Sequence, residues 1–478
     1  MSTHVGKVRG VAMGAGAAWR GIPFAAPPVG ALRWREARPA QGWRGVRDAS
    51  AFGADCVQPQ RDGKPTARQS EDCLTLSVIT PNRAARGLSV LVSVHGGAFF
   101  VGSGRYIAEH DLSPIVQRGV ILVSANYRLG RLGFFAHPAL REEAGRGTGN
   151  FWLSDQIEAL RWVRMNIHAF GGDPEKVTIL GCSAGGSSIN SLMASPAARG
   201  LFARASAHSG GGLFNASRPL DHAEREGIAF AARLGVEDRG PHGLAALRRL
   251  DSAMILYGDP GPPNFGAIED GALLPKAVSL IFAEGKQAAV PYIAGSTSNE
   301  ASVFGLMGFD AAVMKQRFGI DLAELRPLYE AQGPLHEAEL LRRVQTDFIF
   351  TSASMGMTAL ASRHAPAWSY YFDYVPAAER ATSPGAPHCA DMEYLFGLRD
   401  SPSAAQHITA LWRDYWTNFI RAGDPNGLGL PAWPHMSEHH ISPLVIRDTF
   451  AAQPGFQEAV IRYWHAKWQK ESGALILP

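Results

Sequence analysis

The chain has little that points to a nucleic acid, a nucleotide cofactor or a membrane. Its 478 residues carry 46 lysines and arginines against 43 aspartates and glutamates, a formal charge of only +3. That excess is too small to favour a polyanionic partner, so we expect no nucleic acid. No window reaches the roughly 18 uninterrupted apolar residues that a membrane span needs. No G-x-G-x-x-G follows an expected strand and no G-x-x-x-x-G-K-[ST] is present, so we expect no cofactor.

Cysteine is also scarce, and the chain opens without a recognisable targeting segment. The four cysteines are Cys56, Cys73, Cys182 and Cys389, and none belongs to a C-x-x-C pair. We therefore expect no metal site. No charged segment followed by an apolar stretch opens the sequence, so we expect no secretory signal and a cytoplasmic location. Cys56 and Cys73 would suit a disulfide in an oxidising compartment, but a cytoplasmic location predicts two free thiols.

What the chain does have is an alternation of apolar strands and amphipathic helices. Apolar runs predict strands over residues 89–95, 120–124, 177–180, 291–294 and 368–372, and apolar spacings of three to four predict helices over 154–170 and 408–419. Prolines exclude a helix over 21–28. Such alternation is typical of an α/β fold with a mostly parallel central sheet flanked by helices. No linker divides the chain, so we predict one domain over residues 1–478, with helical insertions at about 215–286 and 304–365.

The most informative motif is Gly181-Cys182-Ser183-Ala184-Gly185, directly behind the strand predicted at 177–180. A G-x-S-x-G between a strand and a helix is typical of a nucleophile elbow, a turn so tight that only glycine fits beside it. The elbow exposes the serine hydroxyl and directs the next N–H to a position where an oxyanion can form. A serine attacks at neutral pH only with a base, an acid that orients the base, and oxyanion donors.

Candidates for these partners follow from position along the chain. His95-Gly96-Gly97 follows a predicted strand and has glycine where backbone N–H groups must approach a substrate closely. Glu300 and His388 lie in loops that follow later predicted strands, in the order serine, acid, histidine of an α/β-hydrolase. The chain has 43 carboxylates and 16 histidines, so position alone leaves other acids and bases open. It also leaves His95-Gly96-Gly97 open as a simple strand-ending turn.

Longer motifs extend along most of the chain. They are Glu71-Asp72-Cys73-Leu74-Thr75-Leu76-Ser77-Val78, Asn126-Tyr127-Arg128, Phe170-Gly171-Gly172-Asp173-Pro174 leading into the elbow, and Asp424-Pro425-Asn426 with Trp433-Pro434. From Gly6 to about Pro434 the sequence resembles the type B carboxylesterases, which include the cholinesterases and the bacterial p-nitrobenzyl esterases. The resemblance implies an α/β-hydrolase fold and hydrolysis of small-molecule carboxylic esters through an acyl-enzyme.

The resemblance also assigns roles. The family's acid lies in a loop that Asn299-Glu300-Ala301 matches, and its histidine precedes an acidic-aromatic run that His388 to Gly397 matches. Ser183, Glu300 and His388 are thus the implied catalytic triad. The remaining implied residues are the oxyanion donors Gly97, Ala98 and Ala184, a supporting hydrogen bond from Ser209, and the structural pairs Arg33 with Glu71 and Arg128 with Asp155. Phe99, Phe100, Phe134 and Phe135 either line the substrate pocket or belong to the core.

Two departures from the family bear on the substrate. Most relatives carry Glu before the nucleophile, and this chain has Cys182, which removes an attraction for cationic substrates. The loop between Cys56 and Cys73 contains no Trp, Tyr or Phe, whereas cholinesterases hold quaternary ammonium there by cation–π contact. We therefore predict preference for neutral esters and poor turnover of choline esters.

Alternatives remain within and outside this chemistry. The same triad would serve an amidase or a carbamate hydrolase. A non-catalytic binding protein on this fold would lack the nucleophile, and all three triad residues are present. The sequence leaves open whether the protein is a monomer or a homodimer.

Overall fold

The structure of the protein is a computed structural model that describes residues 1–59, 68–109, 113–215, 217–259, 264–305, 309–331, 333–398, 405–437 and 440–474. It contains two compact units. The first unit is Met1–Arg204 with Ala216–Val278, and the second is Ala205–Asn215 with Ser279–Pro478.

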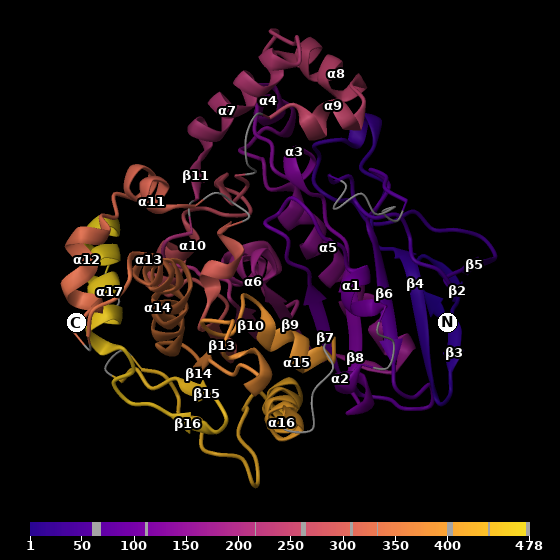
Figure 1. Ribbon diagram of the computed structural model, residues 1–478. Helices are drawn as coiled ribbons and strands as arrows, with labels where there is room; N and C mark the ends of the chain where they lie inside the picture. Colours follow the sequence, from indigo (N-terminus) through magenta and orange to yellow (C-terminus); the bar gives the residue numbers. More distant parts are fainter. Residues whose placement is uncertain are drawn as a thin grey trace. The chain divides into compact units, whose positions relative to one another are not determined.

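The first unit is built on a mixed sheet whose strands lie in the order β9-β7-β8-β6-β4-β3. These strands are β3 (Val11–Met13), β4 (Gly16–Pro23), β6 (Thr75–Thr80), β7 (Leu88–Val94), β8 (Ile121–Ala125) and β9 (Gly172–Cys182). β7 pairs in parallel with both β8 and β9, and the strands beyond β8 pair antiparallel. β7 and β8 are almost fully buried, as expected for strands covered on both faces. Figure 1 shows β4, β6, β8 and β7 side by side.

Helices and short strands complete the first unit. The helices are α1 (Arg105–Ala108), α2 (Pro114–Gln117), α3 (Gly130–Gly133), α4 (Pro138–Ala144), α5 (Phe151–Asn166), α6 (Ala184–Ala194), α7 (Leu220–Arg233), α8 (Pro241–Arg249) and α9 (Ser252–Tyr257), with 3₁₀ turns at Gly30–Leu32, Ile167–Phe170 and Pro196–Ala198. The short strands are β1 (Ser2–Thr3), β2 (Gly6–Arg9), β5 (Val46–Asp48), β11 (Arg218–Pro219) and β12 (Ile268–Glu269).

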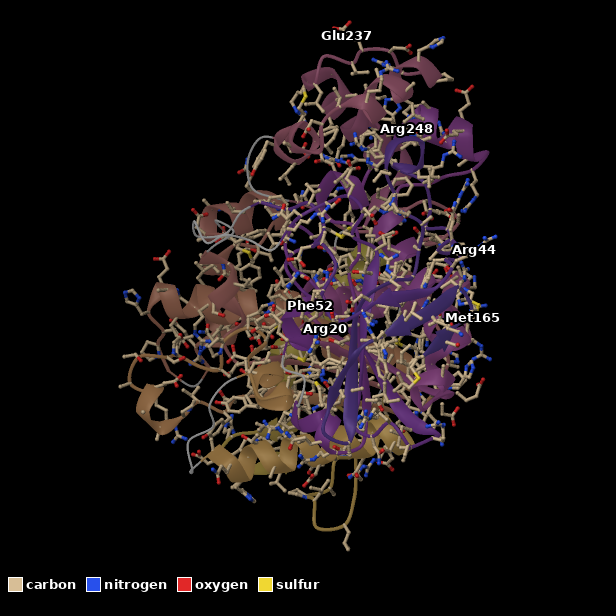
Figure 2. All side chains as sticks on the ribbon, turned by 90° about the vertical axis from the view of Figure 1, so that its right-hand side faces the viewer. Arg20, Arg44, Phe52, Met165, Glu237 and Arg248 are labelled. Atoms are coloured by element: carbon tan, nitrogen blue, oxygen red, sulfur yellow. A yellow bond between two sulfur atoms is a disulfide. The ribbon has the colours of Figure 1, made fainter. Side chains whose placement is uncertain are left out.

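Helices α7 to α9 form the helical insertion predicted between about 215 and 286. Phe230, Leu244 and Ile255 from these helices pack in one core cluster with Phe135. Figure 2 labels Arg248 of α8, which donates to both carboxylate oxygens of Glu143 at 2.7 and 2.8 Å. The insertion is therefore held by its own apolar core and by an ion pair to α4.

The second unit carries parallel strands in the order β10-β13-β14-β15, with β16 antiparallel at the edge. The strands are β10 (Arg204–His208), β13 (Tyr292–Thr297), β14 (Ala367–Phe372), β15 (Leu444–Ile446) and β16 (Phe450–Ala452). The helices are α10 (Val278–Ala283), α11 (Ala311–Phe318), α12 (Leu322–Tyr329), α13 (Glu337–Thr346), α14 (Ser352–Ser362), α15 (Ala390–Phe396), α16 (Gln406–Ala422) and α17 (Glu458–Ser472), with 3₁₀ turns at Glu300–Val303 and Ala377–Glu379 and a π-helical turn at Asp347–Thr351.

The predicted strands and helices all occur, with ends shifted by a few residues. The helix predicted over 154–170 is α5 followed by a 3₁₀ turn, and the strand predicted over 177–180 is the end of the longer β9. The predicted α/β class is confirmed. Pairing is mostly parallel in the second unit, and in the first unit it is parallel from β9 through β7 to β8 and antiparallel beyond β8. None of the helices in the described ranges combines the length and the apolar character that a bilayer crossing requires.

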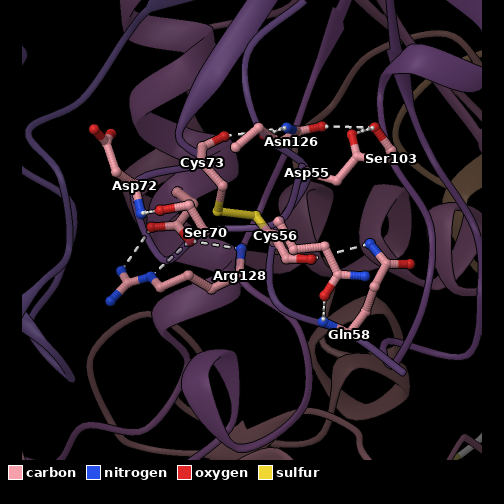
Figure 3. The surroundings of a disulfide bond; sticks show 12 residues. Asp55, Cys56, Gln58, Ser70, Asp72, Cys73, Ser103, Asn126 and Arg128 are labelled. Atoms are coloured by element: carbon pink, nitrogen blue, oxygen red, sulfur yellow. Dashed lines mark hydrogen bonds and ion pairs between the residues drawn. A yellow bond between two sulfur atoms is a disulfide. The ribbon is translucent and has the colours of Figure 1, made fainter. Parts of the chain in front are cut away.

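The prediction of free thiols is wrong. Cys56 and Cys73 form a disulfide, with their Cα atoms 5.0 Å apart (Figure 3). The backbone around them fixes this proximity, because Ser70 N–H donates to Asp55 O at 3.0 Å and Asn126 donates its side-chain amide to Cys73 O at 3.1 Å. All four cysteines lie among the described residues, and none is a free thiol. The prediction of free thiols rested on the expected cytoplasmic location alone, which says nothing about how close the two cysteines lie.

Candidate active site

Ser183 lies between β9 and α6 in the left-handed region, with φ 61° and ψ −127°. The flanking glycines are required by contact. A Cβ on Gly181 would lie 2.6 Å from the Gly185 carbonyl, and a Cβ on Gly185 would lie 2.3 Å from Val94 O. The motif therefore forms the tight turn that its sequence predicted, with a strained serine at the centre.

The glycine loop after β7 lies directly against this turn. A Cβ on Gly96 would lie 2.7 Å from Cys182 O and 3.2 Å from the Ser183 Cβ. A Cβ on Gly97, whose φ is 114°, would lie 1.9 Å from Val101 O. Only glycine fits at either position, so this is more than a strand-ending turn.

The backbone groups expected to bind an oxyanion are presented by this pair of loops. In the described part of the chain, the N–H groups of Gly97 and Ala98 donate to no backbone carbonyl. Ala184 is the first residue of α6, where a helix leaves its N–H groups without intrahelical partners. Ala98 has φ 53°, a conformation that favours glycine, so this alanine is held in place by the loop.

His95 packs against the loop. Its ring stacks on Tyr127 with centroids 4.2 Å apart, and its Nδ1 lies 2.9 Å from Gly96 O. Tyr127 in turn donates its hydroxyl to His95 O at 2.9 Å. Burial lowers the pKa of His95 to about 4, so its ring is neutral near pH 7.

In the second unit, Glu300 and His388 are brought together from two different strand ends. Glu300 follows β13 and His388 follows β14. Nδ1 of His388 makes a short hydrogen bond to Oε2 of Glu300, which is fully buried. The two loops are joined by backbone, because Asn299 N–H donates to Ala386 O at 2.9 Å. The acid and histidine that the sequence singled out among many thus form a pair.

The other oxygen of Glu300 is held as well. Oε1 accepts from the Ser209 hydroxyl at 2.6 Å and from Thr297 N–H at 2.7 Å. The Ser209 contact agrees with the supporting role that the resemblance implied. The Thr297 contact is a backbone donor, which no side-chain pattern in the sequence could reveal. With both oxygens occupied, the carboxylate has one orientation.

A general base needs an imidazole nitrogen that can accept a proton, and in His388 this atom is Nε2. Nε2 of His388 is buried and has no hydrogen-bond partner among the described residues. Phe350, from the π-helical turn Asp347–Thr351, packs on the ring with centroids 5.1 Å apart. Sequence analysis missed Phe350, since it lies in an insertion far from any motif. Ser183 belongs to the first unit and His388 to the second, so their contact stays a prediction.

The four aromatic candidates differ in position. Phe99, Phe134 and Trp152 pack together with ring centroids 4.9 to 5.1 Å apart, and Phe100 next to them is half-buried. Phe135 is fully buried in the core cluster beneath α7 to α9, so it has the core role that the sequence left as an alternative. Whether the other three meet a substrate stays a prediction.

The two arginine–carboxylate pairs implied by the resemblance are present and structural. Arg33 donates to both oxygens of Glu71 at 2.8 and 2.5 Å. Arg128 donates Nε and Nη2 to Asp155 at 2.8 and 2.6 Å, and both side chains are buried. In the described residues, no three histidine, cysteine or carboxylate side chains gather into a group that could hold a metal ion.

The chain is similar over most of its length to known sequences and solved structures. The model of the carboxylesterase family matches residues 1–329 and 328–464. Para-nitrobenzyl esterase of Bacillus subtilis is 32% identical, covering 93% of this chain and 94% of its own. Phenmedipham hydrolase of Pseudarthrobacter oxydans is 33% identical, covering 90% of this chain and 91% of its own.

A solved structure of PNB esterase superposes with a TM-score of 0.85 at 30% identity, covering 97% of this chain and 98% of its own. This likeness shows the α/β-hydrolase fold. With a family model that spans most of the residues and with relatives above 30% identity, the chain belongs to the carboxylesterase family, a family of carboxylic-ester hydrolases.

Proposed function

We propose that the protein is a serine carboxylesterase that hydrolyses neutral carboxylic esters through an acyl-enzyme on Ser183. The observation that carries the proposal is the Glu300–His388 pair, whose second imidazole nitrogen has no partner among the residues that the structure describes, in a chain that also forms a nucleophile elbow. The catalytic residues are divided between the two units, so we also propose that the units act as one hydrolase domain.

In the first half-reaction, the Ser183 oxygen attacks the ester carbonyl carbon while Nε2 of His388 takes the hydroxyl proton. Glu300 holds the imidazole by its Nδ1–H and stabilises the cation that forms. The carbonyl oxygen becomes an oxyanion and accepts hydrogen bonds from the N–H groups of Ala98 and Ala184, together with Gly97. The tetrahedral intermediate then expels the alcohol, which leaves with the proton from His388.

In the second half-reaction, water attacks the acyl-enzyme carbonyl and His388 takes its proton. The second intermediate releases the carboxylic acid and returns the proton to Ser183. The reaction therefore needs only the ester and water.

The substrate class follows from charge near the nucleophile. Position 182 holds a cysteine with no negative charge to attract a cationic alcohol. The segment between Cys56 and Cys73, of which residues 60–67 lie outside the described residues, has no aromatic side chain to bind quaternary ammonium. Neutral esters are the class that this arrangement favours.

Two experiments test the proposal. Hydrolysis of p-nitrophenyl esters with acyl chains from C2 to C16 is measured for the wild type, Ser183→Ala and His388→Ala. Loss of a triad member should lower kcat on the order of 10⁴- to 10⁶-fold. Ester hydrolysis retained by Ser183→Ala would contradict the acyl-enzyme mechanism.

The substrate class is tested with butyrylcholine and its neutral isostere 3,3-dimethylbutyl butyrate, which differ only in charge. We expect kcat/KM to favour the neutral ester by at least about tenfold, which corresponds to ~1.4 kcal/mol. Comparable values for the two esters would refute the preference.

A further inference from the structure

A second acid–histidine pair adjoins the proposed catalytic residues in the second unit. Nδ1 of His208 lies 2.5 Å from Oδ2 of Asp391, and the Tyr370 hydroxyl donates to the same oxygen at 2.7 Å. The Tyr370 oxygen also lies 2.8 Å from His208 Nδ1. None of the three side chains is exposed to solvent. His208, Tyr370 and Asp391 are called the inner cluster below.

Two tryptophans from α16 enclose the inner cluster. The ring centroids of Trp416 and His208 lie 4.5 Å apart, and those of Trp412 and Tyr370 lie 5.1 Å apart. Trp412 also donates its indole N–H to the backbone oxygen of Asp391 at 3.1 Å. In such apolar surroundings hydrogen bonds are strong and misalignment is costly, so the three side chains have a narrowly defined arrangement.

Stability alone does not explain the inner cluster. A buried, hydrogen-bonded pair of polar side chains contributes little net stability compared with apolar side chains of the same volume, because both groups lose their hydration. The positions of His208 and Asp391 along the chain indicate a role in the proposed site. His208 ends β10 and immediately precedes Ser209, whose hydroxyl donates to Glu300. Asp391 lies in the first turn of α15, three residues after His388.

The backbone at both junctions is in the left-handed region. Ser209 has φ 44° and Cys389 has φ 64°, conformations that residues other than glycine keep only where the surroundings impose them. Ser209 N–H donates to Gly295 O at 2.8 Å. Gly295 packs so closely on Tyr370 that a Cβ there would lie 2.4 Å from the ring. The inner cluster thus contacts the segments that fix Ser209 and adjoins the one that carries His388.

We propose that the inner cluster positions Ser209 and His388 around Glu300, and so sets the geometry of the Glu300–His388 hydrogen bond. The inference rests on the proposed function, since it gives these residues a role in that site. None of the three touches the substrate, so they are positioning residues. Their loss changes the rate of the chemical step more than it changes substrate binding.

Two matched tyrosine variants test this role. Tyr370→Phe removes one buried hydroxyl from the inner cluster. Tyr329→Phe removes a buried hydroxyl of the same unit that accepts from Trp464 at 3.0 Å and hydrogen-bonds to the Asp347 carboxyl; among the described residues it has no hydrogen bond to Glu300 or to the inner cluster. We expect similar, small decreases in unfolding stability. With p-nitrophenyl butyrate, only Tyr370→Phe should lower kcat, by about tenfold, with KM changed less than about twofold.

A proton NMR spectrum distinguishes positioning from general stabilisation, because the chemical shift of the His388 Nδ1–H proton depends on the geometry of its hydrogen bond. The Nδ1–H proton between His388 and Glu300 should resonate far downfield, and it should disappear in His388→Ala. We expect it to shift in Tyr370→Phe and Asp391→Asn and to stay in place in Tyr329→Phe. Asp391→Asn should also lower kcat, by about 10²-fold.

Unchanged kcat and an unchanged resonance in Tyr370→Phe would overturn the proposal, whether or not Asp391→Asn folds. Equal losses of kcat in the two tyrosine variants would also overturn it, since they would indicate general destabilisation. A wild-type protein without esterase activity would refute the proposed function instead, and the resonance would still report whether the inner cluster sets the Glu300–His388 bond.

Discussion

The backbone of Ser183 leads to a prediction about stability. Its φ of 61° and ψ of −127° are the mirror image of an extended conformation, which glycine adopts freely and other residues do not. Ser183→Gly should therefore remove strain that Ser183→Ala keeps, although both variants lose the nucleophile. Ser183 is the N-cap of α6 without a side-chain capping bond, so neither variant loses a cap.

The magnitude follows from opposing effects. Strain of this kind costs about 1–3 kcal/mol. Glycine loses about 0.5–1 kcal/mol through the greater freedom of the unfolded chain. The difference runs from about 0 to about 2.5 kcal/mol, so Ser183→Gly should exceed Ser183→Ala in free energy of unfolding by about 1 kcal/mol. Urea titration followed by tryptophan fluorescence measures the difference.

The other end of the same helix supplies a control. Ser195 has an ordinary φ of −79°, so Ser195→Gly should be less stable than Ser195→Ala, by about 0.5–1 kcal/mol. The reasoning fails if Ser183→Gly is no more stable than Ser183→Ala while the Ser195 pair behaves as expected.

Three further predictions concern other parts of the chain. Gly96→Ala would place a methyl group against Cys182 O and the Ser183 Cβ. Because only glycine fits there, the resulting shift should lower Tm and should lower kcat for p-nitrophenyl butyrate by about 10²-fold; a wild-type kcat would contradict it. Because no cysteine is a free thiol, the denatured, unreduced protein should show no reaction with a thiol reagent and should react at all four cysteines after reduction. Burial raises the pKa of the Asp347 carboxyl to about 7 from 3.8, so this group's contribution to the free energy of unfolding falls as the pH rises from about 4 to about 7. Asp347→Asn should remove that loss, so the variant's free energy of unfolding relative to wild type should be up to about 4 kcal/mol higher at pH 8 than at pH 4. An equal difference between variant and wild type at both pH values would refute this.

The sequence was most informative where backbone geometry is local. Gly181 and Gly185 are required by contacts within a few residues of Ser183 or on the adjacent strand, so the motif itself implies the turn. The order of serine, acid and histidine made Glu300 and His388 candidates, the family resemblance selected them, and the structure pairs them.

Features that depend on distant packing could not be predicted. Phe350 reaches His388 through a π-helical turn inside an insertion, and no spacing in the sequence marks that turn. The inner cluster joins side chains from β10, β14 and α15, which are far apart along the chain. The disulfide was missed for a different reason, because its prediction relied on a presumed compartment and not on the proximity of the two cysteines.

The Cys56–Cys73 disulfide turns residues 56–73 into a closed covalent ring. This ring contains Arg61 and Arg68, which are sites of the kind that trypsin cleaves. A single cut inside a ring opens it without separating the chain into two molecules. A protein nicked there would migrate as one species until the disulfide is reduced, and only then as two fragments.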